Sequence, residues 1–69
     1  METMLDLIYR KKRALSAAEW LKNTGGYTVR IGEGFSLYFS VLTKTGDYEL
    51  FVVGASTLIN YARTKGWKP

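Results

Sequence analysis

The chain has 69 residues, no cysteine, no histidine and a formal net charge of +4. This length allows one small domain, residues 1–69, which hides only about 60% of the surface that its unfolded chain would expose. Disulfides and structural metals, the usual aids for so small a core, are largely excluded by the missing side chains. The same absence removes the thiol nucleophile and the imidazole base, so we expect no enzymatic activity, no cofactor and no small-molecule substrate.

Composition and charge also indicate the cellular location of the chain and the kind of partner that it binds. Apolar residues make up 46% of the sequence, which is enough for a packed core. No apolar run approaches the roughly 18 residues of a membrane span. In a secretory signal the cations come before the apolar residues, whereas here the first cations come after them. We therefore expect a cytoplasmic protein with no membrane partner. Ten Lys and Arg against six Asp and Glu favour a polyanionic partner.

A first helix is predicted from about Met4, because Thr3 can cap it and the Asp6 carboxylate favours its positive end. Apolar residues at helical spacing predict its inward face: Met4, Leu5, Ile8, Leu15 and Ala18. Ser16 and Glu19 form a second capping signature inside the same segment. The pattern therefore leaves open whether one helix runs to Lys22 or breaks near Leu15 and restarts. In both cases the glycine pair at 25–26 ends it.

Alternating apolar and polar residues predict three strands, at about 27–31, 35–42 and 48–53, joined by turns at 32–34 and 43–47. The inward face is predicted to consist of Tyr27, Val29, Ile31, Phe35, Leu37, Phe39, Val41, Tyr48, Leu50 and Val52. Pairing Thr43 with Tyr48 sets the register of the last two strands. Val41 then lies opposite Leu50, and Phe39 lies opposite Val52.

A second helix is predicted over 57–65, with Ser56 as its cap and Gly66 at its C-terminal end. Trp67 is expected to fold back on the last turn. The fold class is then α+β, in the order helix, three-stranded antiparallel meander, helix (αβββα), with both helices packed on one face of the sheet. The six acidic residues show no close metal-ligand spacing, so no metal site is expected.

In element order the chain resembles double-stranded-RNA-binding domains, which also run helix, three strands, helix. That family holds phosphates with a lysine cluster at the start of its second helix, where this chain has Ser-Thr-Leu-Ile-Asn at 56–60, so no phosphate-binding residue carries over. The strands and last helix also look like the small DNA-binding arms of some phage integrases, which insert a sheet into the major groove. That likeness implies a reading surface on the open sheet face, with Arg30, Tyr38 and Phe51.

Two groups of residues are candidate binding sites. The first is the run of four cations after Tyr9: Arg10, Lys11, Lys12 and Arg13. Like charges three or four residues apart destabilise a helix, so a run kept despite that cost indicates an anionic partner, although a solvated helix face is the alternative interpretation. The second group lies on the sheet face away from the helices, where exposed apolar residues favour a protein contact over base stacking.

The two groups give two hypotheses for function. The first is a small basic accessory protein, of the kind that phages and mobile elements encode, that binds DNA or RNA. Its contacts would come from Arg10, Lys11, Lys12, Arg13, Arg30 and Tyr38. The alternative is a protein-interaction module, either a phage-type inhibitor that docks on an acidic surface of a host protein or a homodimer. Its interface would be formed by Tyr38, Phe51 and Val53.

Overall fold

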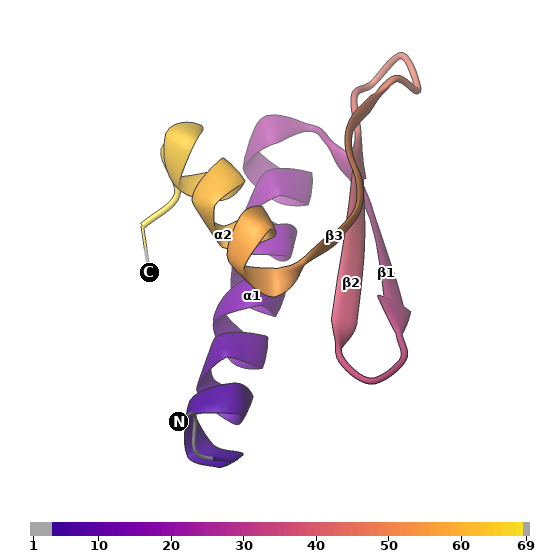
Figure 1. The fold of residues 1–69 in the computed structure, drawn as a ribbon. Coiled ribbons are helices and arrows are strands. Elements are labelled where there is room, and N and C mark those ends of the chain that lie inside the picture. Colours follow the sequence, from indigo (N-terminus) through magenta and orange to yellow (C-terminus); the bar gives the residue numbers. More distant parts are fainter. Residues whose placement is uncertain (1–3, 69) are drawn as a thin grey trace.

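The computed structural model describes the backbone of residues 4–68 and the side chains of residues 8–68. Its elements are α1 (Met4–Gly25), β1 (Thr28–Glu33), β2 (Leu37–Leu42), β3 (Tyr48–Gly54) and α2 (Ala55–Thr64). The strands form one antiparallel sheet in the order β1-β2-β3. Both helices lie on the same side of this sheet (Figure 1). The predicted αβββα order and its α+β class are therefore confirmed.

The first helix is unbroken, which resolves the alternative that the sequence left open. The capping signature at Ser16 sits in the interior of α1 without interrupting it. Its inward face is made mainly of alanines: Ala14, Ala17, Ala18 and Leu21 are buried. Leu15, predicted to point inward, is 37% exposed, because the stripe that packs is centred on the small residues that let α2 approach closely. The predicted Thr3 cap lies outside the described residues, as do the side chains of Met4, Leu5 and Asp6.

A β-bulge in β3 changes which residues of that strand point inward. Val41 pairs with Leu50 as predicted, but Phe39 pairs with Val53 rather than Val52, and Leu42 rather than Thr43 pairs with Tyr48. Two residues of β3, Phe51 and Val52, therefore oppose the single residue Ser40 of β2. The predicted inward position of Val52 is wrong.

The bulge is held by one side-chain hydrogen bond. The backbone N–H of Val52 donates to Oγ of Ser40 at 3.1 Å. Val52 has a φ of 50°, in the left-handed region that a β-branched residue rarely adopts. This backbone turn shifts the alternation by one residue, so that Val53 packs against the core and Val52 is 54% exposed.

Phe35 was predicted on the inward face of the second strand and is instead fully exposed. The pairing of β1 and β2 continues to Glu33 and Leu37, which leaves residues 34–36 as a three-residue hairpin loop. Within this loop the N–H of Gly34 donates to the carbonyl oxygen of Ser36 at 3.1 Å. Phe35 therefore stands at the tip of the hairpin and not in the strand.

The second helix begins earlier than predicted and ends as predicted. Because β3 runs directly into α2, the cap position falls on Gly54, and the predicted Ser56 cap is wrong. At the other end Gly66 has a φ of 114°, and its N–H donates to the carbonyl oxygen of Arg63 at 3.1 Å. The N–H of Trp67 donates to the carbonyl oxygen of Ala62 at 3.0 Å, which completes a Schellman motif. Trp67 folds back and is buried.

The core lies between the sheet and the two helices. Its buried members are Ala14, Ala17, Ala18, Leu21, Phe39, Val41, Leu58, Ile59, Ala62 and Trp67. Phe39 and Val41 come from the central strand, so β2 carries the sheet's share of the fully buried side chains. The alanines of α1 leave room for Leu58 and Ile59 of α2, and this close packing fixes the two helices side by side. Polar side chains that flank this seam are therefore brought together.

Candidate anion-binding surface

A groove of about 370 Å³ runs along the outer side of the seam between α1 and α2. It is lined by Tyr9, Arg10, Arg13, Ser56, Ile59, Asn60 and Arg63. Residues three or four apart share one face of a helix, so the α1 and α2 residues form two facing rows. Three arginines line it, and the lining residues that the structure describes include no carboxylate. We call this surface the helix groove.

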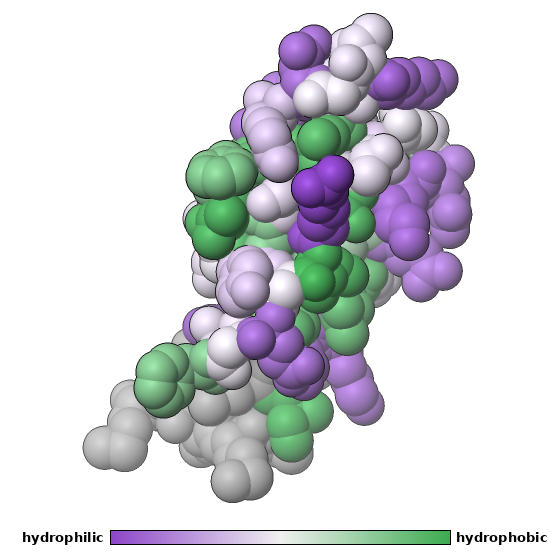
Figure 2. All heavy atoms as spheres, turned by 90° about the vertical axis from the view of Figure 1, so that its right-hand side faces the viewer, coloured by the Kyte–Doolittle hydropathy of each residue, from purple (hydrophilic) through white to green (hydrophobic). Residues whose placement is uncertain are grey.

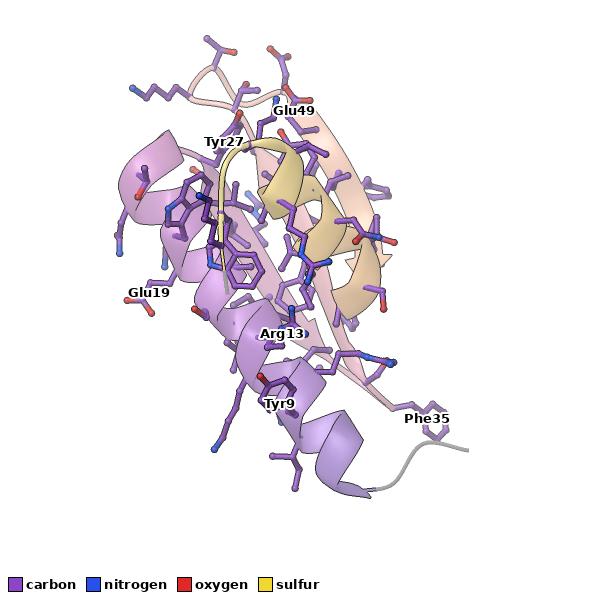
Figure 3. All side chains as sticks on the ribbon, turned by 90° about the vertical axis from the view of Figure 1, so that its left-hand side faces the viewer. Tyr9, Arg13, Glu19, Tyr27, Phe35 and Glu49 are labelled. Atoms are coloured by element: carbon purple, nitrogen blue, oxygen red, sulfur yellow. The ribbon has the colours of Figure 1, made fainter. Side chains whose placement is uncertain are left out.

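Arg13 is held in the helix groove by its neighbours on α1. Its guanidinium carbon lies 5.7 Å from the centre of the Tyr9 ring, a cation–π contact, and Figure 3 shows both side chains on the same side of α1. The Nε of Arg13 is buried and has no hydrogen-bond partner among the described residues. Within the described range no ion pair involves Arg13 or Arg63. These charges are placed by packing and are not neutralised by the part of the protein that is described.

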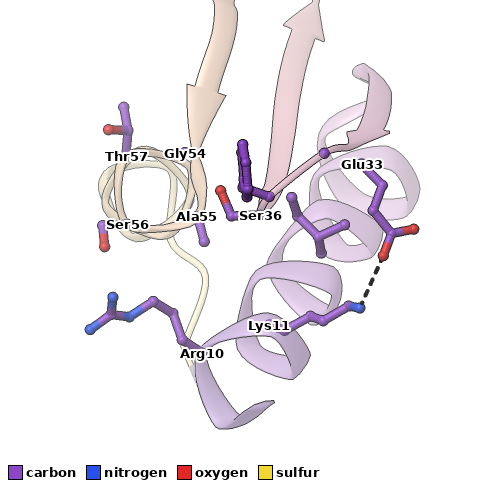
Figure 4. Close-up of a pocket in the computed structure, with 11 residues that line it drawn as sticks. Arg10, Lys11, Glu33, Ser36, Gly54, Ala55, Ser56 and Thr57 are labelled. Carbon is purple, nitrogen blue, oxygen red and sulfur yellow. Dashed lines mark hydrogen bonds and ion pairs between the residues drawn. The ribbon is translucent and has the colours of Figure 1, made fainter. Parts of the chain in front are cut away.

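A second cavity, of about 340 Å³, adjoins the helix groove at the hairpin end of the sheet. We call it the hairpin pocket (Figure 4). Its lining residues are Arg10, Lys11, Glu33, Gly34, Phe35, Ser36, Leu37, Gly54, Ala55, Ser56 and Thr57. Arg10 and Ser56 line both cavities, so the two are neighbours. The first turn of α2 at its wall carries no acidic residue and no side-chain cap, so the positive end of this helix is not offset locally.

The structure divides the predicted basic run among three directions. Arg10 and Arg13 line the helix groove. Lys11 points toward the hairpin, where its Nζ lies 3.5 Å from Oε1 of Glu33. Lys12 is exposed and lines neither cavity. The sequence groups the four cations as one candidate site, but an α-helix turns by about 100° per residue, so four consecutive side chains cannot share one face.

Arg63 belongs to the helix groove, and sequence reasoning missed it. A cation in the last turn of a helix is favoured by the helix dipole, which is a sufficient reason for Arg63 when α2 is considered alone. The signal that could have found it is spacing: Ser56, Asn60 and Arg63 recur at intervals of four and three residues, on one polar stripe of α2. That α1 lies beside this stripe is tertiary information.

The sheet face that points away from α1 and α2 is the open sheet face (Figure 2). Three of the other predicted site residues lie on it: Arg30, Tyr38 and Phe51. Arg30 lies opposite Ser40. The ring of Tyr38 covers Gly32, its neighbour on β1, so closely that a Cβ added at Gly32 would overlap it. Phe51 is 67% exposed, and its ring meets that of Tyr48 edge to face at a centroid distance of 4.9 Å. Apolar side chains on this face are interspersed with hydrophilic ones.

Two corrections to the predicted sites follow from this arrangement. Val53 does not belong to the open sheet face, because the bulge turns it toward the core, where it packs. Arg30 and Tyr38 are not continuous with the cations of α1, because they alternate with the inward residues Phe39 and Val41 and their partners, whereas α1 lies on the inward side of the sheet (Figure 1). The predicted nucleic-acid residues therefore form two separate surfaces.

Tyr61 is the one described residue with a clear shift in its pKa. Burial raises the pKa of its hydroxyl above the usual value, and the Tyr27 hydroxyl beside it adds to the increase. The two rings meet edge to face at 6.1 Å, and Nζ of Lys65 lies 5.3 Å from the centre of the Tyr61 ring. Tyr61 lines neither cavity, so its titration is separate from the candidate site.

The described part of the chain contains neither a cluster of metal ligands nor a helix that could span a membrane. There, no three acidic side chains come together as metal ligands would. Neither described helix combines the length and the apolar character that crossing a bilayer requires. Comparison of the chain with protein-family models, with curated proteins and with solved structures finds no match. The features of the molecule that bear on function are therefore the two cavities and the open sheet face.

Proposed function

We propose that this protein binds nucleic acid through the helix groove, without catalysing a reaction. The observation that carries the proposal is the convergence of Arg10, Arg13 and Arg63 from two helices on one groove, together with the lack of a described carboxylate beside Arg13 and Arg63. Guanidinium groups bind phosphate with paired N–H donors and are the side chains best suited to a phosphate backbone. Ser56 and Asn60 add neutral hydrogen-bonding groups between the charges. The lack of cysteine fits a cytoplasmic setting.

The salt dependence of binding tests this proposal. Affinity for a labelled oligonucleotide would be measured by fluorescence anisotropy at several salt concentrations. Each phosphate neutralised contributes about −0.7 to −0.9 to the log–log slope, so three arginines give a slope of about −2 to −3. Arg63→Gln should make the slope less negative by about 1.

Lys44→Gln is the matched control, since Lys44 is exposed on the turn between β2 and β3, away from both cavities. It removes the same charge and should leave the slope nearly unchanged. Binding that ignored salt would contradict the proposal. So would an Arg63→Gln variant that behaved like the Lys44→Gln control.

The open sheet face supports a second candidate function, a protein contact. The supporting observation is that Phe51 and Val52, adjacent on edge strand β3, are both more than half exposed. The partner would be a host protein, as for a phage-type inhibitor, or a second copy of the chain. In the second case light scattering should give a dimer mass for the wild type and a monomer mass for Phe51→Asp, with an unchanged circular dichroism spectrum. A monomeric wild type would exclude the homodimer.

A further inference from the structure

Phe35 is the most exposed large apolar side chain in the described chain. It stands in the three-residue loop at the tip of the β1–β2 hairpin, and Figure 3 shows it projecting away from the rest of the molecule. The core gains nothing from it, because no buried residue packs against it. A single exposed apolar residue needs no explanation by itself. The position of Phe35 relative to the arginines is what suggests a role in binding.

Phe35 lines the hairpin pocket together with Arg10, and Arg10 also lines the helix groove. The loop that carries Phe35 therefore borders a cavity that adjoins the helix groove and its three arginines. The ion pair between Lys11 and Glu33 joins α1 to the last residue of β1, immediately before the loop that carries Phe35. This contact helps to fix the distance between the ring and the arginines of α1.

We propose that the nucleic acid bound here is single-stranded, with a base stacked on Phe35 and the adjoining phosphates in the helix groove. The inference rests on the proposed function and specifies its substrate. In a duplex the faces of the bases are covered by their neighbours, whereas a single strand exposes them to aromatic side chains. An aromatic ring beside a row of cations matches the alternation of base and phosphate along such a strand.

The open sheet face does not offer the same combination. The ring of Tyr38 already lies on Gly32, so one of its faces is taken by the fold. Tyr38 and Phe51 are also separated from the helix groove by the sheet. Stacking on the hairpin tip places base and phosphate contacts at two adjoining cavities, and stacking on the sheet does not.

The experiment compares one labelled oligonucleotide, as a single strand and annealed to its complement, by fluorescence anisotropy at equal salt. Phe35→Ala should weaken single-strand binding about 10-fold, within the range of base stacking on an aromatic side chain, and change duplex binding less than about 2-fold. Phe35→Leu keeps an apolar side chain without a π face and should behave like Phe35→Ala. Phe35→Trp should retain affinity, with the emission of the new tryptophan changing when the strand binds.

The outcomes separate this inference from the proposed function. If no oligonucleotide binds with salt dependence, the proposed function fails. If both forms bind and Phe35→Ala changes neither, or changes both equally, nucleic-acid binding stands and the single-strand inference is overturned. Rescue by Phe35→Leu, or Phe35-dependent binding to vesicles of phosphatidylserine and phosphatidylcholine that exceeds oligonucleotide binding, would also overturn it and indicate an apolar or lipid partner. Thermal unfolding of each variant should match the wild type, because Phe35 is outside the core.

Discussion

The helix groove and the open sheet face differ in how far the fold itself supplies partners for their exposed groups. On the open sheet face Tyr38 lies on Gly32, Phe51 meets Tyr48, and Ser40 accepts the N–H of Val52. In the helix groove, by contrast, the described residues give Arg13 and Arg63 no carboxylate. Exposure alone therefore does not distinguish the two regions. The difference is that cations brought together without anions gain from a ligand, whereas the open face has already used much of its contact capacity internally.

The largest expected effect tests the helix groove directly. The double variant Arg13→Gln with Arg63→Gln should lower affinity for an oligonucleotide about 100-fold at low salt, since each hydrogen-bonded charge pair contributes roughly 1.5 to 3 kcal/mol. The measurement is fluorescence anisotropy, with circular dichroism to verify folding. Lys22→Gln with Lys44→Gln removes the same total charge elsewhere and should cost less than about 3-fold. Equal losses in the two double variants would show that net charge, not the groove, governs binding.

The next effect tests whether the open sheet face depends on its own hydrogen bond. Ser40→Ala removes the acceptor for the N–H of Val52 and should lower the free energy of unfolding by about 1 to 2 kcal/mol. Urea denaturation measures it. Ser36→Ala, in the exposed hairpin loop, is the matched control and should change stability by less than about 0.5 kcal/mol. If the two variants are equally stable, the bulge does not need the Ser40 hydroxyl.

A smaller effect of opposite sign is expected at Val52. Asparagine tolerates the left-handed backbone better than a β-branched residue, so Val52→Asn should raise the free energy of unfolding by about 1 kcal/mol. The same substitution one residue on, Val53→Asn, places an amide against the core and should destabilise the protein by more than about 2 kcal/mol. Chemical denaturation of the pair checks the register. If Val52→Asn were the more destabilising of the two variants, Val52 would face the core, as the sequence predicted.

The smallest effect concerns pH and lies outside both regions. Burial raises the pKa of Tyr61 in the folded state above its value in the unfolded state, which is near 10. Below pH 10 the hydroxyl is neutral in both states, and its contribution to stability is fully present. As pH rises above that value the unfolded state loses its proton first, and stability falls. Tyr61→Phe should reduce the decline in melting temperature above pH 10 and leave oligonucleotide binding between pH 6 and 9 unchanged. An identical alkaline decline in Tyr61→Phe would assign the loss to other groups.

The parts of the fold that the sequence predicted are those with local causes. Gly66 and Trp67 end α2 as expected, because the left-handed glycine and the apolar residue after it are adjacent in the chain. The predicted pairing of Val41 with Leu50 is also observed, but it depends on a second register shift, at Glu49, because the turn places Leu42 rather than Thr43 opposite Tyr48. The bulge was not predictable in this way, because valine disfavours a positive φ and the hydroxyl that bonds to the bulge, that of Ser40, lies on another strand.

The candidate site was predictable only in part, and for a related reason. Arg10 and Arg13 attracted attention as members of a basic run. Arg63 lies 50 positions after Arg13, and only the packing of α2 on the alanine stripe of α1 makes them neighbours. Phe35 was assigned to the core because its alternation with Leu37 is regular, although the hairpin loop extends past it. In both cases the local sequence pattern is real, but it carries no information on where the tertiary fold places the residue.

The bulge in β3 also bears on solubility. Residues 50–53, Leu-Phe-Val-Val, form an apolar and uncharged run on an edge strand, the kind of segment onto which another chain can add a strand. The backbone turn at Val52 interrupts the row of edge N–H and C=O groups, and the Val52 N–H is already bonded to Ser40. An incoming strand would meet a broken ladder here. The strained backbone at Val52 thus disfavours edge-to-edge pairing of β3 with another chain.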